Sequence, residues 1–190
     1  MTIVSGDGVH ASPGMGGLSI ETFRGRQVVG WMPETNRRTL AMLIDRFKVR
    51  SVIEVGSYLG FSACWFAERV ETVVCVDRFD REISPFVANL MGVTPASHYE
   101  LFLANIEAYP NIAHVKADSV AAAAGDVMAD LVYIDAGHEY EDVKADTEAW
   151  RPHAWKVICG DDNQPNWPGV MAYAREIGAD VSERVWWLES

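Results

Sequence analysis

Short apolar runs alternate along the chain with stretches that repeat apolar residues at helical spacing. Most of the runs are rich in valine and isoleucine and end close to an acid or a glycine. An uninterrupted apolar run is typical of a strand that is buried on both faces, as in a parallel sheet. The predicted strands are residues 52–55, 72–76, 111–116, 130–134, 156–160 and 184–188.

The stretches between these runs predict helices. Leu40, Leu43, Ile44 and Phe47 recur at i, i+3, i+4 and i+7, and they follow Pro33, which suits a first helical turn. Further helices are predicted at residues 62–70, 99–108, 139–150 and 169–177. Strands that alternate with helices predict an α/β fold, namely a single Rossmann-like, doubly wound, mostly parallel sheet with helices on both faces.

Three segments lie outside this regular pattern. Residues 1–29 are expected to form a loose lead-in to a single domain that spans residues 1–190. Residues 78–110 form an insert that is longer than a typical connection, which predicts a lid or substrate wall, or equally an oligomer contact. The tail after Gly178 is short and leaves little room for a full terminal hairpin.

Charge and composition exclude several classes of partner. The net charge of −11 argues against a nucleic acid or an anionic membrane surface. No apolar stretch reaches the roughly 18 residues of a membrane span, and residues 1–17 lack the basic and apolar parts of a signal peptide. Cys64, Cys75 and Cys159 lie in predicted helices or strands without metal-ligand spacing, which favours structural thiols in a reducing, cytoplasmic location.

A glycine turn connects the first of these strands to the helix that follows it. Gly56 and Gly60 stand in this turn, which lets a ligand approach the backbone and presents free N–H groups to it. The next strand ends at Asp77, about 20 residues further on, where an acid usually accepts a ribose hydroxyl. Together these positions predict a pocket for a nucleoside-bearing cofactor.

Three acids follow neighbouring predicted strands. Asp135 ends one strand, and Asp161 and Asp162 follow the next. Since neighbouring strands lie about 4.8 Å apart, carboxylates at their tips can share one small cation. Mg²⁺ is often held by one or two carboxylates with water and substrate oxygens. We therefore favour a magnesium site, while Asp162 as a loop acid and Asp135 as a solvated acid remain the alternative.

His138 stands three residues after Asp135. At the mouth of the pocket, an imidazole can take a proton from a substrate hydroxyl near neutral pH. A helix-capping or hydrogen-bonded histidine is an equally good interpretation. Trp167 is a candidate stacking platform for a ring of the substrate, or a residue that packs against its neighbours.

These motifs resemble those of class I S-adenosylmethionine-dependent methyltransferases, among them catechol O-methyltransferase and macrocin-type sugar O-methyltransferases. The resemblance covers roughly residues 34–178. It is strongest over residues 54–62, where the acid, both glycines and the final serine of the catechol-type first motif are present. The other elements of the ordered set are Asp77, Asp118-Ser119, residues 134–138 and Gly160-Asp161-Asp162.

The resemblance implies a role for each of these positions. It implies that Glu54, Gly56 and Gly60 shape the methionine end of the S-adenosylmethionine site, and that Ser62 binds the cofactor carboxylate. The remaining cofactor residues that it implies are Ser57, Tyr58, Asp77 for the ribose, Asp118 and Ser119 beside the adenine, and Asp135. It also places Asp135, Asp161 and Asp162 at the magnesium ligands, and His138 where the catechol-type enzymes carry a lysine base.

The function implied is a metal-assisted O-methyltransferase that acts on a hydroxyl of a small molecule, either a sugar or a catechol-like phenol. Asp135 and His138 are the expected catalytic residues. A nicotinamide-dependent oxidoreductase is a rival, but it would require Gly-x-Gly-x-x-Gly where this turn reads Gly56-x-x-x-Gly60. A cofactor-binding subunit without activity is a second rival, and transfer to nitrogen or carbon a third. The seven tryptophans leave a homo-oligomer open.

Overall fold

The computed structural model of the chain describes residues 18–91 and 97–190. The strands in this part of the chain are β1 (Ser19–Phe23), β2 (Arg26–Gly30), β3 (Ser51–Val55), β4 (Thr72–Asp77), β5 (Ile112–Lys116), β6 (Ala129–Ile134), β7 (Ala154–Gly160), β8 (Asp180–Ser182) and β9 (Val185–Glu189). The helices are α1 (Glu34–Phe47), α2 (Phe61–Ala67), α3 (Pro85–Met91), α4 (His98–Ile106), α5 (Ser119–Ala122), α6 (Tyr140–Trp150), the 3₁₀ helix η1 (Arg151–His153) and α7 (Pro168–Glu176). Among the described residues, no helix has both the length and the apolar content needed to cross a membrane.

Seven of the strands form one sheet in the order β5-β4-β3-β6-β7-β9-β8. Strands β5, β4, β3, β6 and β7 are parallel, whereas β9 runs antiparallel to β7 and β8 antiparallel to β9. The chain leaves the central strand β3 toward β4 and β5 and returns to the other side at β6. This reversal of strand order between β3 and β6 is the position at which α/β sheets bind ligands. The α/β class predicted from the sequence is confirmed.

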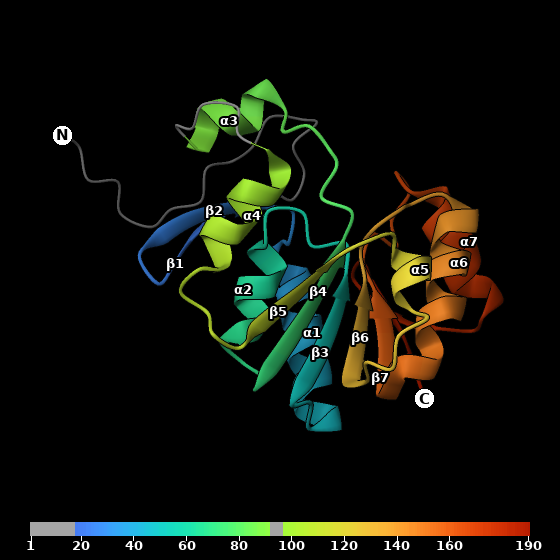
Figure 1. Ribbon diagram of the computed structural model, residues 1–190. Coiled ribbons are helices and arrows are strands. Elements are labelled where there is room, and N and C mark those ends of the chain that lie inside the picture. Colours follow the sequence, from blue (N-terminus) through green and yellow to red (C-terminus); the bar gives the residue numbers. More distant parts are fainter. Residues whose placement is uncertain (1–17, 92–96) are drawn as a thin grey trace.

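Both faces of the sheet are covered, as the uninterrupted apolar runs predict. Val52 faces a core that includes Leu40 of α1 and Phe66 of α2, whereas its neighbour Ile53 faces a second core with Trp150 of α6. Figure 1 shows α2 and α4 on one side of the sheet and α5, α6 and α7 on the other. Successive residues of one strand therefore serve two separate cores, because strand side chains alternate between faces.

The expectation of a loose lead-in over residues 1–29 is wrong for its described part. Residues 19–30 form the antiparallel hairpin β1–β2, in which Arg24 and Gly25 turn with φ of 47° and 88°. The hairpin packs beside α2 and α4 (Figure 1). Arg26 donates to the side chain of Asn105, which in turn donates to the backbone oxygen of Leu59 in the glycine turn. The hairpin thus supports the predicted cofactor loop; residues 1–17 lie outside the described part.

The short tail after Gly178 does form a terminal hairpin, contrary to expectation. Strands β8 and β9 pair in antiparallel fashion, with Asp180 opposite Trp187 and Ser182 opposite Val185. The hairpin fits because β8 has only three residues and because Gly160 of β7 makes room for the Trp186 ring. A Cβ atom at Gly160 would lie 2.5 Å from that ring.

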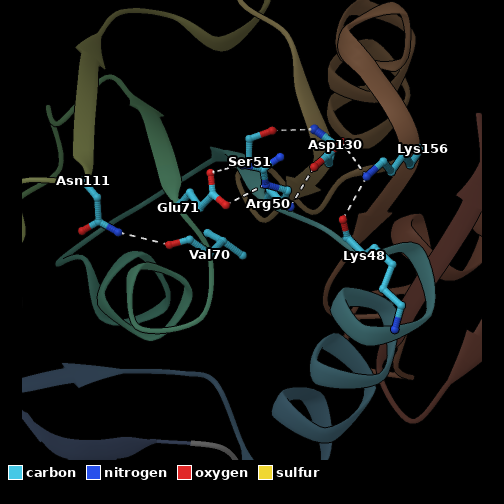
Figure 2. A network of polar contacts seen from close by, with 8 residues as sticks. All are labelled: Lys48, Arg50, Ser51, Val70, Glu71, Asn111, Asp130 and Lys156. Carbon is cyan, nitrogen blue, oxygen red and sulfur yellow. Dashed lines mark hydrogen bonds and ion pairs between the residues drawn. The ribbon is translucent and has the colours of Figure 1, made fainter.

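The amino ends of the strands are fastened together by a polar network (Figure 2). Asp130 accepts the backbone N–H of Arg50 at 2.7 Å and pairs with Lys156 Nζ at 2.9 Å. Its own N–H donates to Ser51 Oγ, and Lys156 also donates to the backbone oxygen of Lys48, which caps α1. These contacts join α1, β3, β6 and β7 at the sheet edge opposite the carboxyl ends of the parallel strands.

Candidate active site

Gly56 stands where the ends of three strands meet. Its N–H donates to the backbone oxygen of Val76 on β4 at 2.8 Å. Its φ is 91°, a left-handed conformation that favours glycine. A Cβ atom here would lie 2.2 Å from the backbone oxygen of Asp135, at the end of β6. The predicted requirement for glycine therefore has two causes, the dihedral angle and the close approach of β6.

Asp77 holds the glycine turn from the tip of β4. Its Oδ2 accepts the N–H groups of Ser57 and Tyr58, both at 2.9 Å, and its Oδ1 accepts the N–H of Phe79 at 2.7 Å. Tyr58 and Phe79 have φ of 44° and 51°, which is uncommon outside glycine and often found at functional sites. The carboxylate therefore organises the loops after β3 and β4, and it faces the cavity described next.

A cavity of about 260 Å³ opens at the carboxyl ends of these strands. Small-molecule sites usually measure about 300–1,000 Å³, so this volume lies near the lower limit for a single ligand. The sequence-predicted residues that line it are Gly56, Tyr58, Asp77, Asp118, Ser119 and Asp135. Further lining residues that the sequence analysis did not single out are Arg78, Asp80, Arg81, His98, Asp142 and Asp146. Sequence alone offered no pattern for these, because the loops and helices that carry them are brought together only by the fold.

The other predicted cofactor residues lie behind the cavity wall. Ser57 and Ser62 are buried, and Gly60, with φ of 82°, caps the start of α2. Glu54 is fully buried in β3, and this burial raises the pKa of its carboxyl from 4.5 to about 7. Ser57, Ser62 and the thiol of Cys75 partly oppose the increase. These residues support the glycine turn from the side away from the cavity and do not line the cavity.

Asp118 and Ser119 lie on the far side of the cavity, at the start of α5. The Asp118 carboxylate accepts the N–H of Ala121 at 3.1 Å and so caps the helix. Ser119 Oγ donates to the carboxylate of Asp146 on α6. Burial raises the pKa of Asp146, and the Ser119 hydroxyl opposes that increase. The predicted adenine side of the site is therefore built from α5 and α6 together.

A second polar group borders the cavity, between the ends of β6 and β7, and shares Asp135 with it. Asp135, His138 and Asp162 each offer one ligand atom, and these atoms lie within 4.8 Å of one another. His138 Nε2 is 2.9 Å from Asp162 Oδ2 and 3.7 Å from Asp135 Oδ1. Asp162 has a φ of 59°, and this left-handed backbone turns its side chain toward the histidine. A divalent cation could bind to such a set of oxygen and nitrogen atoms.

Burial and mutual charge interactions determine the protonation of Asp135, His138 and Asp162. Burial lowers the pKa of His138, but the hydrogen bonds and charges of Asp135 and Asp162 outweigh it and raise the pKa to about 9. Burial raises the pKa of Asp135 well above its ordinary value, and the charges of Asp161 and Asp162 add to this effect while His138 opposes it. With no cation between them, the two carboxylates therefore keep a proton on His138 at neutral pH, and the imidazole can accept a substrate proton only after it loses this one.

Asp161, predicted as a third metal ligand, lies outside this group. It is buried, and its carboxylate accepts four hydrogen bonds: two from Asn36 Nδ2 at 2.6 and 2.8 Å, one from the Tyr133 hydroxyl at 2.8 Å and one from the Asp162 N–H at 2.6 Å. A carboxylate has about four lone-pair sites, so none remains for a cation. The structure thus groups His138, in place of Asp161, with Asp135 and Asp162.

Trp167 covers the outer face of His138. The two rings are stacked, with centroids 4.3 Å apart and planes 20° from parallel. Trp167 is also 36% exposed, so part of its surface remains accessible to a ligand. Both interpretations that the sequence left open, packing and a stacking platform, are compatible with this geometry.

The chain matches the protein family described as "Methyltransferase domain" over residues 53–157. This match spans β3 to β7 and therefore includes the glycine turn, Asp77 and Asp135. No curated protein matches the chain significantly.

Several solved structures share the fold. An O-methyltransferase from Bacillus cereus, solved in complex with SAH, is 17% identical with a TM-score of 0.57, over 83% of this chain and 81% of that one. A putative caffeoyl-CoA O-methyltransferase from Staphylococcus aureus is 13% identical with a TM-score of 0.58, over 80% of this chain and 82% of that one. The calicheamicin methyltransferase CalS11 is 18% identical with a TM-score of 0.53, over 84% and 81%. At these identities the likeness is one of fold.

Proposed function

The chain belongs to the methyltransferase-domain family, and from this premise we propose that it transfers a methyl group from S-adenosylmethionine to a hydroxyl oxygen of a small molecule. The observation that carries the proposal is the single cavity that Gly56, Asp77 and Asp118 line together. These residues come from the ends of three neighbouring strands. Their side chains and backbone groups are those that a nucleoside cofactor requires at such a place.

The cavity residues suit each part of the cofactor. Asp77 accepts three backbone N–H groups, so about one of its four lone-pair sites remains for a ribose hydroxyl. Gly56 leaves space that a Cβ atom would fill. Asp118 and Ser119 border the adenine. When bound, the cofactor supplies a methyl group on a positively charged sulfur. The task of the protein is then to align the acceptor oxygen with that methyl group and to exclude water.

Transfer to oxygen is supported by the group of Asp135, His138 and Asp162 next to the cavity. A hydroxyl is a poor nucleophile at neutral pH and needs its proton removed or its charge stabilised. Structural neighbours named as O-methyltransferases agree with this choice. The acidic surroundings favour a neutral or cationic acceptor, because a polyanion would be repelled.

A divalent cation, with Mg²⁺ as the predicted ion, would be held by Asp135 and Asp162. Their side chains are 27% and 22% exposed, and so each retains access to water and substrate oxygens. Asp161 would position the pair from behind, because its hydrogen bonds to Asn36 and Tyr133 fix the loop after β7. When bound, the cation supplies stabilisation of the negative charge that develops on the acceptor oxygen.

The role of His138 as proton acceptor stays a prediction. Support for this role comes from its position: Nε2 faces Asp162, the ring packs on Trp167, and Nε2 lies 3.7 Å from Asp135, which lines the cavity. Replacing His138 by glutamine keeps a polar side chain and removes the titratable group. A base role requires that this variant lose most of its turnover while it still binds the cofactor.

Calorimetry with S-adenosylhomocysteine tests the cofactor assignment. We expect a single site in the wild-type protein and a loss of at least tenfold in affinity for Asp77→Asn, because one carboxylate hydrogen bond contributes roughly 1.5–3 kcal/mol. Asp45→Asn, at an exposed position of α1, serves as the control and should bind normally. Binding of NAD in preference to S-adenosylhomocysteine would refute the proposal.

Metal dependence is tested separately with a panel of sugar and catechol acceptors. We expect methyl transfer to fall after treatment with EDTA, to return with Mg²⁺ or Mn²⁺, and to fall in Asp162→Asn without a change in cofactor affinity. Full activity in EDTA would refute the cation and leave the methyltransferase assignment standing.

A further inference from the structure

His98 is a buried histidine whose ring nitrogens have no partner. The residue is only 2% exposed, and neither Nδ1 nor Nε2 has a hydrogen-bond partner among the described residues. Buried polar groups are nearly always hydrogen-bonded, and each exception calls for an explanation. His98 is among the residues that line the cofactor cavity, so the missing partner can come from a molecule bound there.

The position of His98 is fixed by its helix and by two aromatic neighbours. Ser97 caps α4 by a reciprocal pair of hydrogen bonds with Glu100, so the first turn of the helix is well held. The His98 ring centroid lies 5.0 Å from that of Tyr58 and 5.4 Å from that of Phe79. The imidazole therefore cannot turn away to find a partner elsewhere without disturbing this packing.

The same two neighbours connect His98 to Asp77. Both Tyr58 and Phe79 donate their backbone N–H to the Asp77 carboxylate. The carboxylate and the imidazole consequently belong to one assembly at the tip of β4, and both line the cavity. Asp135, on the acceptor side, lines the same cavity, whereas His138, Asp161 and Asp162 do not. Because His98 shares its two aromatic neighbours with Asp77, we assign the ligand atom that meets His98 to the cofactor end of the site.

We propose that His98 is a specificity-determining residue that donates a hydrogen bond to a ribose hydroxyl of the cofactor beside Asp77. This inference rests on the proposed function. A carboxylate can only accept, so a hydroxyl that donates its proton to Asp77 keeps lone pairs that need a donor. An imidazole carries at least one N–H donor in either protonation state. The Asp77 carboxylate and the His98 imidazole together select a ligand with two neighbouring hydroxyls more strongly than a carboxylate alone would.

The insert at residues 78–110 then has a definite task in its described part. Helix α4 contributes His98 to the wall of the cavity beside the ribose, whereas the wall expected from the sequence was one for the substrate. The structure thereby assigns to an irregular connection a residue that acts on the cofactor.

Calorimetry with three ligands tests the proposal: S-adenosylhomocysteine and its 2′-deoxy and 3′-deoxy analogues. The test variant is His98→Phe, which keeps the aromatic packing and removes both nitrogens. We expect the variant to bind S-adenosylhomocysteine about tenfold more weakly than the wild type, which corresponds to the contribution of one ordinary hydrogen bond. We expect wild type and variant to bind one of the two deoxy analogues equally, since that analogue lacks the hydroxyl that meets His98.

Two controls separate this role from a structural one. His114→Phe alters a histidine that is hydrogen-bonded to Tyr99 and lies outside the cavity lining, so it should bind all three ligands as the wild type does. His98→Gln, which restores a donor, should recover part of the lost affinity. The thermal midpoint of ligand-free His98→Phe should equal or exceed that of the wild type, because two unpartnered nitrogens are removed.

The outcomes are distinct. Equal affinity of wild type and His98→Phe for S-adenosylhomocysteine overturns the proposal and leaves the proposed function intact. An equal loss for all three ligands also overturns it, because His98 would then only support the fold. A wild-type protein that binds none of the three overturns the proposed function itself.

Discussion

Gly56 combines two constraints that are usually separate. Its backbone is left-handed, and its missing Cβ makes room for the backbone oxygen of Asp135. The glycine was predicted from the sequence as a turn residue at which a ligand approaches the chain. The structure adds that the turn must also admit the end of β6, so the glycine turn and the loop after β6 are packed against each other.

Gly56→Ala is expected to abolish measurable binding of S-adenosylhomocysteine and to destabilise the protein by about 2–4 kcal/mol. Both effects follow from the 2.2 Å approach to Asp135 and from the positive φ. Gly25→Ala is the matched control, since Gly25 has a φ of 88° but no atom within 4 Å of the added Cβ. It should lose only about 1–2 kcal/mol and bind normally. Urea unfolding and calorimetry measure both quantities; normal binding by Gly56→Ala would contradict the expectation.

Glu54 makes stability depend on pH. Its pKa of about 7 in the folded protein exceeds its ordinary value of 4.5, so between these values the folded state binds more protons than the unfolded state. Stability then falls as pH rises through this interval, by up to about 3 kcal/mol. We expect Glu54→Gln to gain stability relative to the wild type between pH 5 and pH 8. Free energies of unfolding at the two values measure this; an unchanged difference would show that Glu54 does not titrate there.

At the scale of elements, the structure differs from the sequence prediction mainly at the two hairpins. Strands β1 and β2 have only five residues each, and their buried residues are confined to Phe23 and to Val28–Gly30, so their apolar pattern is weak. The turn residues Arg24-Gly25 were the available sequence feature, since glycine at such a turn is typical of a two-residue hairpin. Strand β8 has three residues and no apolar run. Both hairpins depend on contacts with the rest of the fold, namely Asn105 for one and Gly160 for the other.

The amino edge of the sheet offers a test of stability without function. Asp130→Asn removes the charge that pairs with Lys156 and weakens the bond to the Arg50 N–H (Figure 2). We expect a loss of about 1–3 kcal/mol with unchanged affinity for S-adenosylhomocysteine, because the site lies at the opposite edge. Glu71→Gln, which breaks an exposed pair with Arg50, should cost less than about 1 kcal/mol. Chemical unfolding and calorimetry decide; a weaker Kd in Asp130→Asn would contradict the separation of the two edges.

For the molecule as a whole, the net charge of −11 is unevenly placed. Six aspartates line the cofactor cavity with only two arginines, Arg78 and Arg81. Repulsion within such a cluster opposes folding and is relieved by mobile ions. The exposed ion pairs elsewhere, such as Arg46 with Glu189, are weakened by salt but contribute little.

Raising the ionic strength from about 0.01 M to about 0.15 M shortens the Debye length from about 30 Å to about 8 Å. We therefore expect the thermal midpoint of the ligand-free protein to rise over this range. Asp142→Asn, which removes one charge from the cavity wall, should show a smaller increase. Differential scanning calorimetry measures both; a midpoint that falls with added salt would mean that ion pairs outweigh the repulsion.

The sequence by itself determined the parallel α/β sheet, the glycine turn and the side chains that stand at the strand ends. These features follow from local periodicity and turn chemistry, which neighbouring residues decide among themselves. It could not determine which of these side chains face one another, because that depends on elements far apart in the chain. Asn36 of α1 donates hydrogen bonds to the carboxylate of Asp161, 125 residues away. The group at the strand ends therefore consists of Asp135, His138 and Asp162. In the same way, only the packing of α4 on Tyr58 and Phe79 brings His98 to the cavity.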